Sequence, residues 1–177
     1  MADPTSHEAQ ASADARGPVR CAVLTVSDSR TVETDQSGPI IRRLLTEAGH
    51  QAVESDLVPD EPDHIRRALE RWLDDPRVDA ILITGGTGVG RRDTTIEIVR
   101  RLIDVELEGF GELFRMLSYE QVKAAAMLSR AVGGLALGGG GGDTFVFSMP
   151  GSTNAVELAM SRLIVPQLAH LVWERKR

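Results

Sequence analysis

The densest group of residues suited to chemistry is the segment Thr84-Gly85-Gly86-Thr87-Gly88-Val89-Gly90-Arg91-Arg92-Asp93. Closely spaced glycines let backbone N–H groups approach an anion, and a helix that starts directly afterwards adds a favourable dipole. Thr87 adds a hydroxyl, and Arg91 and Arg92 offer charge-assisted hydrogen bonds to a phosphate. The segment predicts a phosphate-binding turn. The alternative is a tight strand-to-helix turn without a ligand.

Two known nucleotide-binding motifs are excluded for this segment. A P-loop ends in Gly-Lys followed by Ser or Thr, whereas this chain has Val89-Gly90-Arg91. The dinucleotide fingerprint is G-x-G-x-x-G, and the last spacing is wrong in Gly86-Thr87-Gly88-Val89-Gly90. The four histidines fall in no spacing typical of a metal site or a catalytic triad. The sequence therefore predicts neither a P-loop ATPase nor a Rossmann dehydrogenase.

Two aspartates, Asp60 and Asp93, follow two different predicted strands. If both strands belong to one parallel sheet, their carboxylates meet at the same edge of that sheet. Such a pair suits Mg²⁺, which prefers oxygen ligands and accepts substrate phosphates in its shell. Each aspartate has a structural alternative as the cap of the helix that follows it. Spacing alone supports both interpretations equally.

The elements that must position these residues alternate along the chain. Apolar runs predict buried strands at 21–26, 50–58 and 79–84. Helix starts follow at Ser37-Gly38-Pro39, at 59–63, and at Thr94, where Thr94-x-x-Glu97 fits a capping box. This alternation predicts an α/β fold with a mostly parallel sheet covered on both faces. The buried face of the second helix is predicted as Ile65, Ala68, Leu69 and Trp72.

The alternation ends near Gly133. The runs 131–137 and 144–149 predict two strands joined by a flexible tip at 138–142, which is a small hairpin excursion from the parallel sheet. A final helical region is expected after Pro150-Gly151-Ser152, with Pro166 restarting the helix.

Length and composition limit the classes of protein. The 177 residues suit one well-buried domain, and the net charge of −6 provides no overall positive field for nucleic acid or an anionic membrane. Cys21 is the only cysteine, which excludes an intrachain disulfide and a zinc site with several cysteine ligands. No segment approaches the roughly 18 apolar residues of a membrane span. We therefore expect a protein that binds neither nucleic acid nor a membrane.

The first residues differ in character from the rest. Residues 1–18 are polar, rich in Ala, Ser and Asp, and lack the apolar core of a signal peptide, so we expect a disordered tail. Residues 19–177 are expected to form a single domain, and the protein is expected in the cytoplasm.

Several short motifs occur in one order along the chain. They are Pro59-Asp60-Glu61, Thr84-Gly85-Gly86-Thr87-Gly88, Arg92-Asp93, Gly109-Phe110-Gly111-Glu112, Leu128-Ser129-Arg130 and Met149-Pro150-Gly151-Ser152. Together these motifs resemble the MoaB/MogA family of molybdenum-cofactor biosynthesis proteins over roughly 19–173, and Asp35-x-Ser37-Gly38 resembles the MoaB branch in particular. The resemblance implies a three-layer α/β/α molybdopterin-binding fold, assembled as homotrimers or as hexamers of two trimers. It also implies transfer of an adenylyl group from ATP, with Mg²⁺, to molybdopterin, releasing pyrophosphate.

Individual roles carry over by position in those motifs. Asp60 and Asp93 would be the catalytic acids and the Mg²⁺ ligands. Residues expected to contact the pterin substrate and its phosphate are Thr84, Gly85, Gly86, Thr87, Gly88, Glu112, Ser118, Ser129, Pro150, Gly151 and Ser152.

Alternatives remain open at this point. Ser118 and Ser129 are also compatible with helix-surface hydroxyls, and Glu112 with a solvated acid in a first helical turn. The apolar residues Met116, Leu117, Met127 and Leu128 indicate core or subunit interface. A non-catalytic molybdopterin carrier of the same pathway, or a molybdate-insertion helper, would share this sequence pattern, and other enzymes of the pathway are candidate partners.

Overall fold

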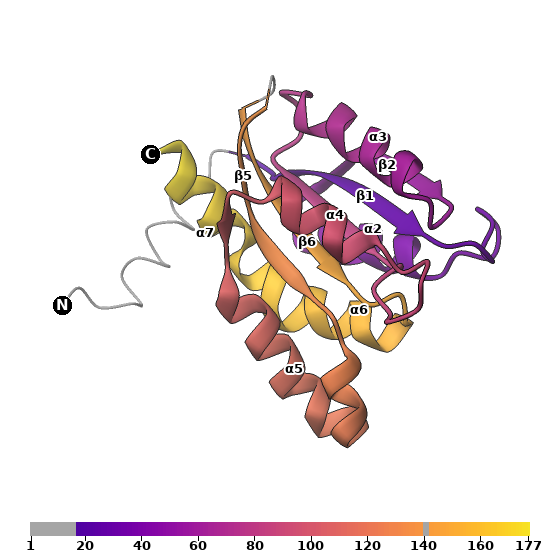
Figure 1. Ribbon diagram of the computed structural model, residues 1–177. Coiled ribbons are helices and arrows are strands. Elements are labelled where there is room, and N and C mark those ends of the chain that lie inside the picture. The colour runs from indigo at the N-terminus through magenta and orange to yellow at the C-terminus, as the bar shows by residue number, and fades with distance from the viewer. Residues whose placement is uncertain (1–16, 140–141) are drawn as a thin grey trace.

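One mixed sheet organises the protein, whose computed structural model describes residues 17–139 and 142–177. Six strands lie in the order β2-β1-β3-β6-β5-β4 (Figure 1). The first four in that order run parallel, whereas β5 pairs antiparallel with β6 and β4 antiparallel with β5. The α/β fold with a mostly parallel sheet and a hairpin excursion is therefore confirmed. The strands are β1 (Arg20–Val26), β2 (Gln51–Val58), β3 (Ala80–Thr84), β4 (Val105–Glu106), β5 (Val132–Gly139) and β6 (Gly142–Met149).

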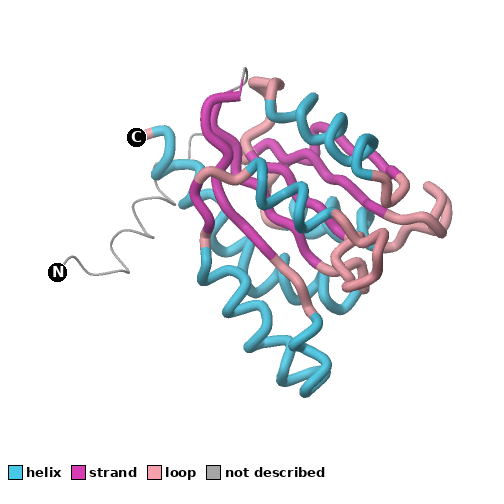
Figure 2. The backbone as a smooth tube through the Cα atoms, viewed as in Figure 1, coloured by secondary structure: helices cyan, strands magenta, loops and turns pink. Residues whose placement is uncertain are grey.

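Helices cover both faces of the sheet, which gives the three layers (Figure 2). Helices α3 and α4 pack on one face, and α2, α5, α6 and α7 pack on the other. The helical elements are α2 (Ser37–Glu47), α3 (Pro62–Leu73), α4 (Thr95–Leu102), α5 (Glu108–Val122), the 3-10 turn η1 (Lys123–Leu128), α6 (Thr153–Ala159), the π-helical turn η2 (Met160–Ile164) and α7 (Val165–Lys176).

The central strands are buried on both sides. Val23 of β1 lies in the core cluster under α2 and α6, whereas its neighbour Leu24 lies in the cluster under α3 and α4. Leu82 and Ile83 of β3 divide in the same way. Successive side chains of a strand point to opposite faces, so a strand covered by helices on both sides is a continuous apolar run.

The C-terminal helical run lies against the sheet. By length and composition alone, its span Thr153–Lys176 is long and apolar enough to cross a membrane. A segment of this kind was not expected from the sequence. Its buried side chains include Met160, Ile164 and Leu168, which belong to the core of this domain. Pro166 follows the π-helical turn and stands in the first turn of α7, where its missing N–H is tolerated.

The capping box at the start of α4 is absent, because Thr94 makes no side-chain cap and Glu97 instead accepts two hydrogen bonds from Arg130, at 2.7 and 2.8 Å. A charge-assisted pair is stronger than a neutral cap.

The expected tail, 1–18, lies outside the described residues except for Gly17 and Pro18, which are exposed. The centre of the glycine tip, 140–141, lies outside them as well.

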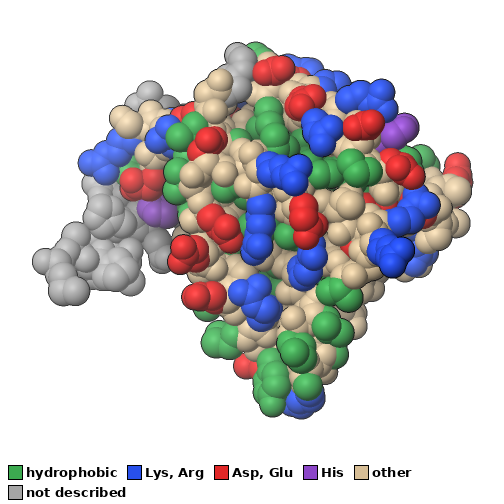
Figure 3. Space-filling model, in the orientation of Figure 1, with side chains coloured by type: hydrophobic (Ala, Val, Ile, Leu, Met, Phe, Trp, Pro, Cys, Tyr) green, Lys and Arg blue, Asp and Glu red, His purple; other side chains and the backbone are tan. Residues whose placement is uncertain are grey.

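An apolar strip remains on the surface of α5 and η1. Leu117 packs against the core, but Met116 and Met127 are exposed, the latter by 79%. Apolar atoms gather at the end of the molecule where α5 and η1 lie (Figure 3). The residues of this strip are Leu113, Met116, Tyr119, Val122, Met127 and Leu128.

The two outer strands of the sheet differ in length. Strand β4 has two residues, whereas β2 has eight and no further strand beside it in the part of the chain that the structure describes. Two carboxylates of β2 form ion pairs with nearby arginines, Glu54 with Arg77 at 3.0 Å and Asp56 with Arg71 at 3.2 Å. Charged groups therefore line this edge.

Candidate functional site

Four loops meet at one edge of the sheet, because β1, β2, β3 and β6 are parallel and end there. The turn after β3 is fastened to the loop after β6 by two hydrogen bonds. Gly85 N–H donates to Met149 O at 3.1 Å, and the Thr84 hydroxyl donates to Pro150 O at 3.2 Å. Two motifs that lie 65 residues apart, at Gly85 and Pro150, thus form one junction.

Glycine is required at this junction. Gly85 has a φ of +98°, and a Cβ there would collide with the Val26 carbonyl oxygen. A Cβ on Gly151 would lie 3.2 Å from the Gly85 Cα. The backbone after three strands approaches so closely here that no side chain fits at Gly85 and a side chain at Gly151 would be tightly packed, which accounts for two glycines of the motifs.

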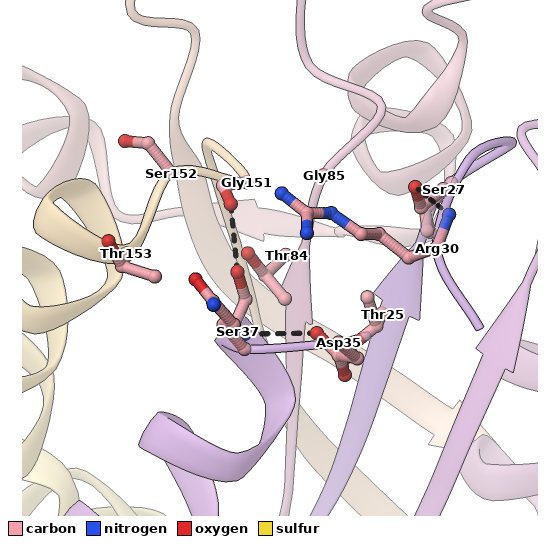
Figure 4. Close-up of a pocket in the computed structure, with 12 residues that line it drawn as sticks. Thr25, Ser27, Arg30, Asp35, Ser37, Thr84, Gly85, Gly151, Ser152 and Thr153 are labelled. Carbon is pink, nitrogen blue, oxygen red and sulfur yellow. Dashed lines mark hydrogen bonds between the residues drawn. The ribbon is translucent and has the colours of Figure 1, made fainter. Parts of the chain in front are cut away.

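A cavity of about 290 Å³ opens beside this junction, on the side of α2 and α6 (Figure 4). Hydroxyl groups dominate it, so it is called the hydroxyl cavity below. Of the residues predicted to bind substrate, it contains Thr84, Gly85, Gly151 and Ser152. Its other lining residues are Thr25, Val26, Ser27, Arg30, Asp35, Gln36, Ser37 and Thr153.

Sequence reasoning did not assign a role to the loop between β1 and α2. In the sequence, Asp35 and Ser37 indicated only which branch of the family the chain resembles, yet both residues line the cavity. Asp35 accepts hydrogen bonds from the Thr25 hydroxyl at 2.8 Å and from Ser37 N–H at 2.9 Å, and Ser37 donates its hydroxyl to Gly151 O at 2.8 Å. The signal in the sequence is the polar segment 27–38, which follows a buried strand and contains Asp35 and Ser37.

The two predicted catalytic aspartates lie on the other side of the glycine turn, at the starts of α3 and α4. A Cβ on Gly86 would lie 2.8 Å from Asp60 Oδ2, and a Cβ on Gly88 would lie 2.7 Å from Asp93 Oδ2. Asp93 also accepts a hydrogen bond from Gly90 N–H at 2.8 Å. Both carboxylates therefore converge on the glycine-rich turn, and neither lines the hydroxyl cavity.

The environment of Asp60 disfavours its charged form. The residue is 8% exposed, and burial raises the pKa of its carboxyl above the ordinary value of 3.8. The Thr94 backbone N–H opposes this shift, whereas the negative charges of Asp93 and Asp28 add to it. The Arg92 guanidinium lowers the pKa only in part. A cation beside Asp60 would remove this electrostatic cost.

An ion-pair network ties three of the loops together. Arg92 contacts Glu61 at 2.7 Å and Asp28 at 3.2 Å, and Asp28 accepts the Asp60 backbone N–H at 3.0 Å. Both Arg91 and Arg92 are exposed, and Arg92 is engaged with protein carboxylates. Of the two arginines expected to reach a phosphate, Arg92 serves here to hold the aspartate loops.

The residues around Asp60 fit a magnesium ion. Asp60 Oδ1 and the hydroxyls of Thr94 and Thr95 are buried without a hydrogen-bond partner. A Cβ on Gly86 would fill the space between Asp60 and Thr95, so the missing side chain leaves a polar cradle. Among the described residues no group of three or more His, Cys, Asp or Glu is placed to hold a metal. Mg²⁺ commonly takes only one or two carboxylates and completes its shell with water and phosphates.

The remaining predicted residues lie apart from this turn. Ser129 lines a second cavity of about 370 Å³, between α4, α5 and η1, together with Arg100, Arg115 and Arg130. We call it the arginine cavity. Ser118 is buried on α5, and Glu112 is exposed on the same helix.

The fold and the glycine junction define a molybdopterin-binding domain. The family described as "Probable molybdopterin binding domain" matches residues 22–170, which is most of the chain. The protein therefore belongs to the MoaB/MogA family, as its motifs indicated.

Within that family the chain is similar to the proteins named "Molybdenum cofactor biosynthesis protein B". The protein of that name from Bacillus cereus is 47% identical over 174 residues, which cover 98% of each chain. A crystal structure of a molybdenum cofactor biosynthesis protein B superposes with a TM-score of 0.85 at 47% identity, covering 90% of this chain and 97% of the other. The tungsten cofactor synthesizing protein MoaB from Pyrococcus furiosus gives a TM-score of 0.81 at 36% identity, covering 90% and 98%.

Proposed function

We propose that this protein acts in molybdenum-cofactor biosynthesis as a molybdopterin adenylyltransferase. The observation that carries the proposal is the convergence of Asp60 and Asp93 on the glycine-rich turn, where Asp60 Oδ1 is buried without a partner. Isolated structural aspartates have no reason to keep an unsatisfied buried oxygen, because such an atom costs about 1–3 kcal/mol. A carboxylate that binds a metal ion in the working enzyme has such a reason, because the ion would occupy the free oxygen.

The reaction joins two phosphates. An oxygen of the terminal phosphate of molybdopterin attacks the α-phosphorus of ATP and forms a new P–O bond. The bond between the α-phosphorus and the bridging oxygen breaks, and pyrophosphate leaves with the electron pair. Such transfers depend mainly on positioning and on neutralising charge.

The chain's own residues supply the positioning. The Thr84–Gly88 turn would lie beside the substrate phosphates, and the Arg92 network fixes the loops that carry Asp60 and Asp93. Mg²⁺ held by those two carboxylates would supply a positive charge to the phosphate oxygens. The proposal includes a cytoplasmic location. It also includes assembly into homotrimers or hexamers, for which the apolar strip on α5 and η1 offers a surface.

A second candidate is a non-catalytic carrier of molybdopterin. It is favoured by one observation, that the hydroxyl cavity is lined by neither Asp60 nor Asp93. A carrier needs a pocket for the pterin, but it needs no carboxylates beside a phosphate.

Pyrophosphate release separates the two candidates. The purified protein is incubated with molybdopterin, MgCl₂ and ATP, and pyrophosphate is measured by a coupled assay. Release that depends on both molybdopterin and Mg²⁺ supports the adenylyltransferase. Stoichiometric binding of molybdopterin without any release would show a carrier.

A further inference from the structure

Two threonines at the start of α4 carry hydroxyl groups that no helix cap accounts for. Thr94 precedes the helix without capping it, and Thr95 is its first residue. Within the part of the chain that the structure describes, the hydroxyl oxygens of both are buried without a hydrogen-bond partner. A threonine at a helix start is ordinarily explained by capping. Because a buried polar group without a partner is unfavourable, these hydroxyls indicate that something binds beside them.

Thr95 is held against the glycine-rich turn. Its side chain is fully buried, and its backbone N–H donates to Gly86 O at 3.2 Å. A Cβ on Gly86 would collide with the Thr95 hydroxyl oxygen and would lie 2.8 Å from Asp60 Oδ2. The hydroxyl and the carboxylate therefore border the same small space, which exists because residue 86 has no side chain.

Asp60 contributes a second unsatisfied oxygen to this space. Its Oδ1 atom is buried without a partner, and its charge is destabilised by burial and by the carboxylates of Asp93 and Asp28. A water molecule in the space would satisfy hydrogen bonds but would leave this charge uncompensated. A cation satisfies both oxygens and compensates the charge.

The charges around the space also favour a cation. The N-terminus of α4 carries about half a positive charge, which opposes one. The full negative charges of Asp60 and Asp93 outweigh that partial charge, and the nearby guanidinium of Arg92 is already paired with Glu61 and Asp28. The net field at Thr95 therefore attracts a positive ion.

We propose that the Thr95 hydroxyl oxygen is a ligand of the divalent cation that the two aspartates bind. The inference rests on the proposed function and names a third protein oxygen for its metal site. Threonine and serine hydroxyls bind Mg²⁺ in other nucleotide sites, so the donor is chemically suited. A neutral hydroxyl adds a ligand without adding negative charge, which leaves more of the charge of the ion for phosphate oxygens.

Metal binding by the full-length protein tests this assignment without any turnover. Mn²⁺ serves as the probe, because it takes the same oxygen ligands as Mg²⁺ and its free and bound forms differ in electron paramagnetic resonance. In Thr95→Val, which keeps the shape but removes the oxygen, we expect Mn²⁺ to bind on the order of 10-fold more weakly or worse. Thr95→Ser keeps the oxygen and should bind within about threefold of wild type.

A soft-metal variant shows whether residue 95 touches the ion. Thr95→Cys replaces a hard oxygen by a thiolate, so Mn²⁺ affinity should fall and Cd²⁺ affinity should rise. Bound Cd²⁺ should then give an ultraviolet thiolate-to-metal charge-transfer band. Wild-type protein with Cd²⁺ is the reference, since its one cysteine, Cys21, is buried in the core.

Thr144→Val is the matched control for the loss of a buried threonine hydroxyl. Thr144 is 1% exposed and lies at the start of β6, next to the residue that pairs with Ala80, and thus at the edge of the sheet opposite the glycine turn. Its substitution should leave Mn²⁺ affinity unchanged. In metal-free buffer Thr95→Val should melt at the wild-type temperature or above it, because the hydroxyl that it removes has no partner there.

Each outcome decides the assignment. Mn²⁺ affinity within twofold of wild type in Thr95→Val overturns it, as does an equal loss in Thr95→Ser, the same loss in Thr144→Val, or wild-type protein that binds no Mn²⁺. A loss in Thr95→Val without a cadmium band in Thr95→Cys also overturns it, because the hydroxyl then acts on Asp60 and not on the ion.

The same measurements separate this inference from the proposed function. If Mn²⁺ binding depends on Thr95 but the wild type releases no pyrophosphate, the metal ligand stands and the adenylyltransferase proposal fails. If Mg²⁺-dependent pyrophosphate release occurs and Thr95→Val binds Mn²⁺ normally, only the assignment of Thr95 fails.

Discussion

Lys176, near the end of the chain, donates a hydrogen bond of 2.8 Å to the buried carboxylate of Asp79, which precedes β3. Arg20 at the start of β1 contacts the same carboxylate at 3.0 Å. One acid therefore fastens the first strand and the last helix to the middle of the sheet. Its position is at the edge opposite the glycine junction, so its contribution is to stability alone.

The first prediction concerns acid stability. Burial alone would raise the pKa of Asp79, but the hydrogen bonds from Arg20 and Lys176 outweigh burial and lower the pKa below 3.8. A depressed folded-state pKa gives stability that is present above the unfolded-state value and lost as pH falls through the folded-state value. The melting temperature of the wild type should thus fall steeply below about pH 4.

Asp79→Asn isolates this contribution. At pH 7 the variant should lose about 2–4 kcal/mol of unfolding free energy in urea, because the basic partners lose a buried charge. Its stability should then vary less with pH below 4 than that of the wild type. Asp63→Asn, which alters an exposed pair of 3.1 Å with Arg66, serves as the control and should change stability by a few tenths of a kcal/mol at most. Equal stability of Asp79→Asn and wild type at pH 7 would contradict the prediction.

The second prediction concerns the two catalytic aspartates. Asp93→Asn should lower pyrophosphate release on the order of a thousandfold while molybdopterin affinity stays nearly unchanged, since an amide keeps the size but loses the charge that Mg²⁺ needs. Asp60→Asn should act similarly, and the double variant should be little worse than either single one if both hold one ion. Assays of release and affinity on all three variants decide this. Full activity of Asp93→Asn would refute the catalytic assignment.

The third prediction concerns the glycine junction. Gly85→Ala should destabilise the fold by about 3 kcal/mol or more and abolish ligand binding, because the new Cβ meets the Val26 carbonyl and the residue must keep a positive φ. Gly49→Ala is the control, since Gly49 has a φ of +80° but nothing within 4 Å of its Cβ position. The difference between the two variants, measured by urea unfolding, is the cost of the close approach. Equal losses would mean that backbone conformation explains the whole effect.

The fourth prediction concerns assembly. Sedimentation at micromolar concentration should show a trimer or hexamer of the 19.2 kDa chain. The double variant Met116→Glu/Tyr119→Glu should shift the protein toward the monomer, because charges would have to be buried in the apolar strip. Val32→Glu, on an exposed loop away from the strip, should leave assembly unchanged. A monomer for the wild type, or a stable trimer for the double variant, would contradict the prediction.

Much of the fold could be predicted because the relevant signals are local. The buried face of α3 consists of the residues that the helical spacing indicates, Ile65, Ala68, Leu69 and Trp72. Strand β3 is the apolar run 80–84. By contrast, β4 exists through the pairing of Val105 with Leu135, and no spacing within its own two residues reveals that contact.

The candidate site was predictable in part for the same reason. Parallel strands place Asp60 and Asp93 at the same edge as Thr84 and Gly151, and the sequence sufficed for that inference. Which side of the glycine turn each residue occupies depends on helix packing, so the sequence did not separate the aspartates from the hydroxyl cavity. The hydrogen bond between Ser37 and Gly151, 114 residues apart, likewise has no local signal.

The two ends of the sheet also bear on how the protein behaves when it is concentrated. A strand at the edge of a sheet can template another strand, and this is a route to amyloid-like growth. Strand β4 has only two residues, and β2 carries the ion pairs of Glu54 with Arg77 and of Asp56 with Arg71. The sheet therefore offers a second molecule little to extend, because one of its edges is short and the other carries charged side chains that a new strand would have to accommodate.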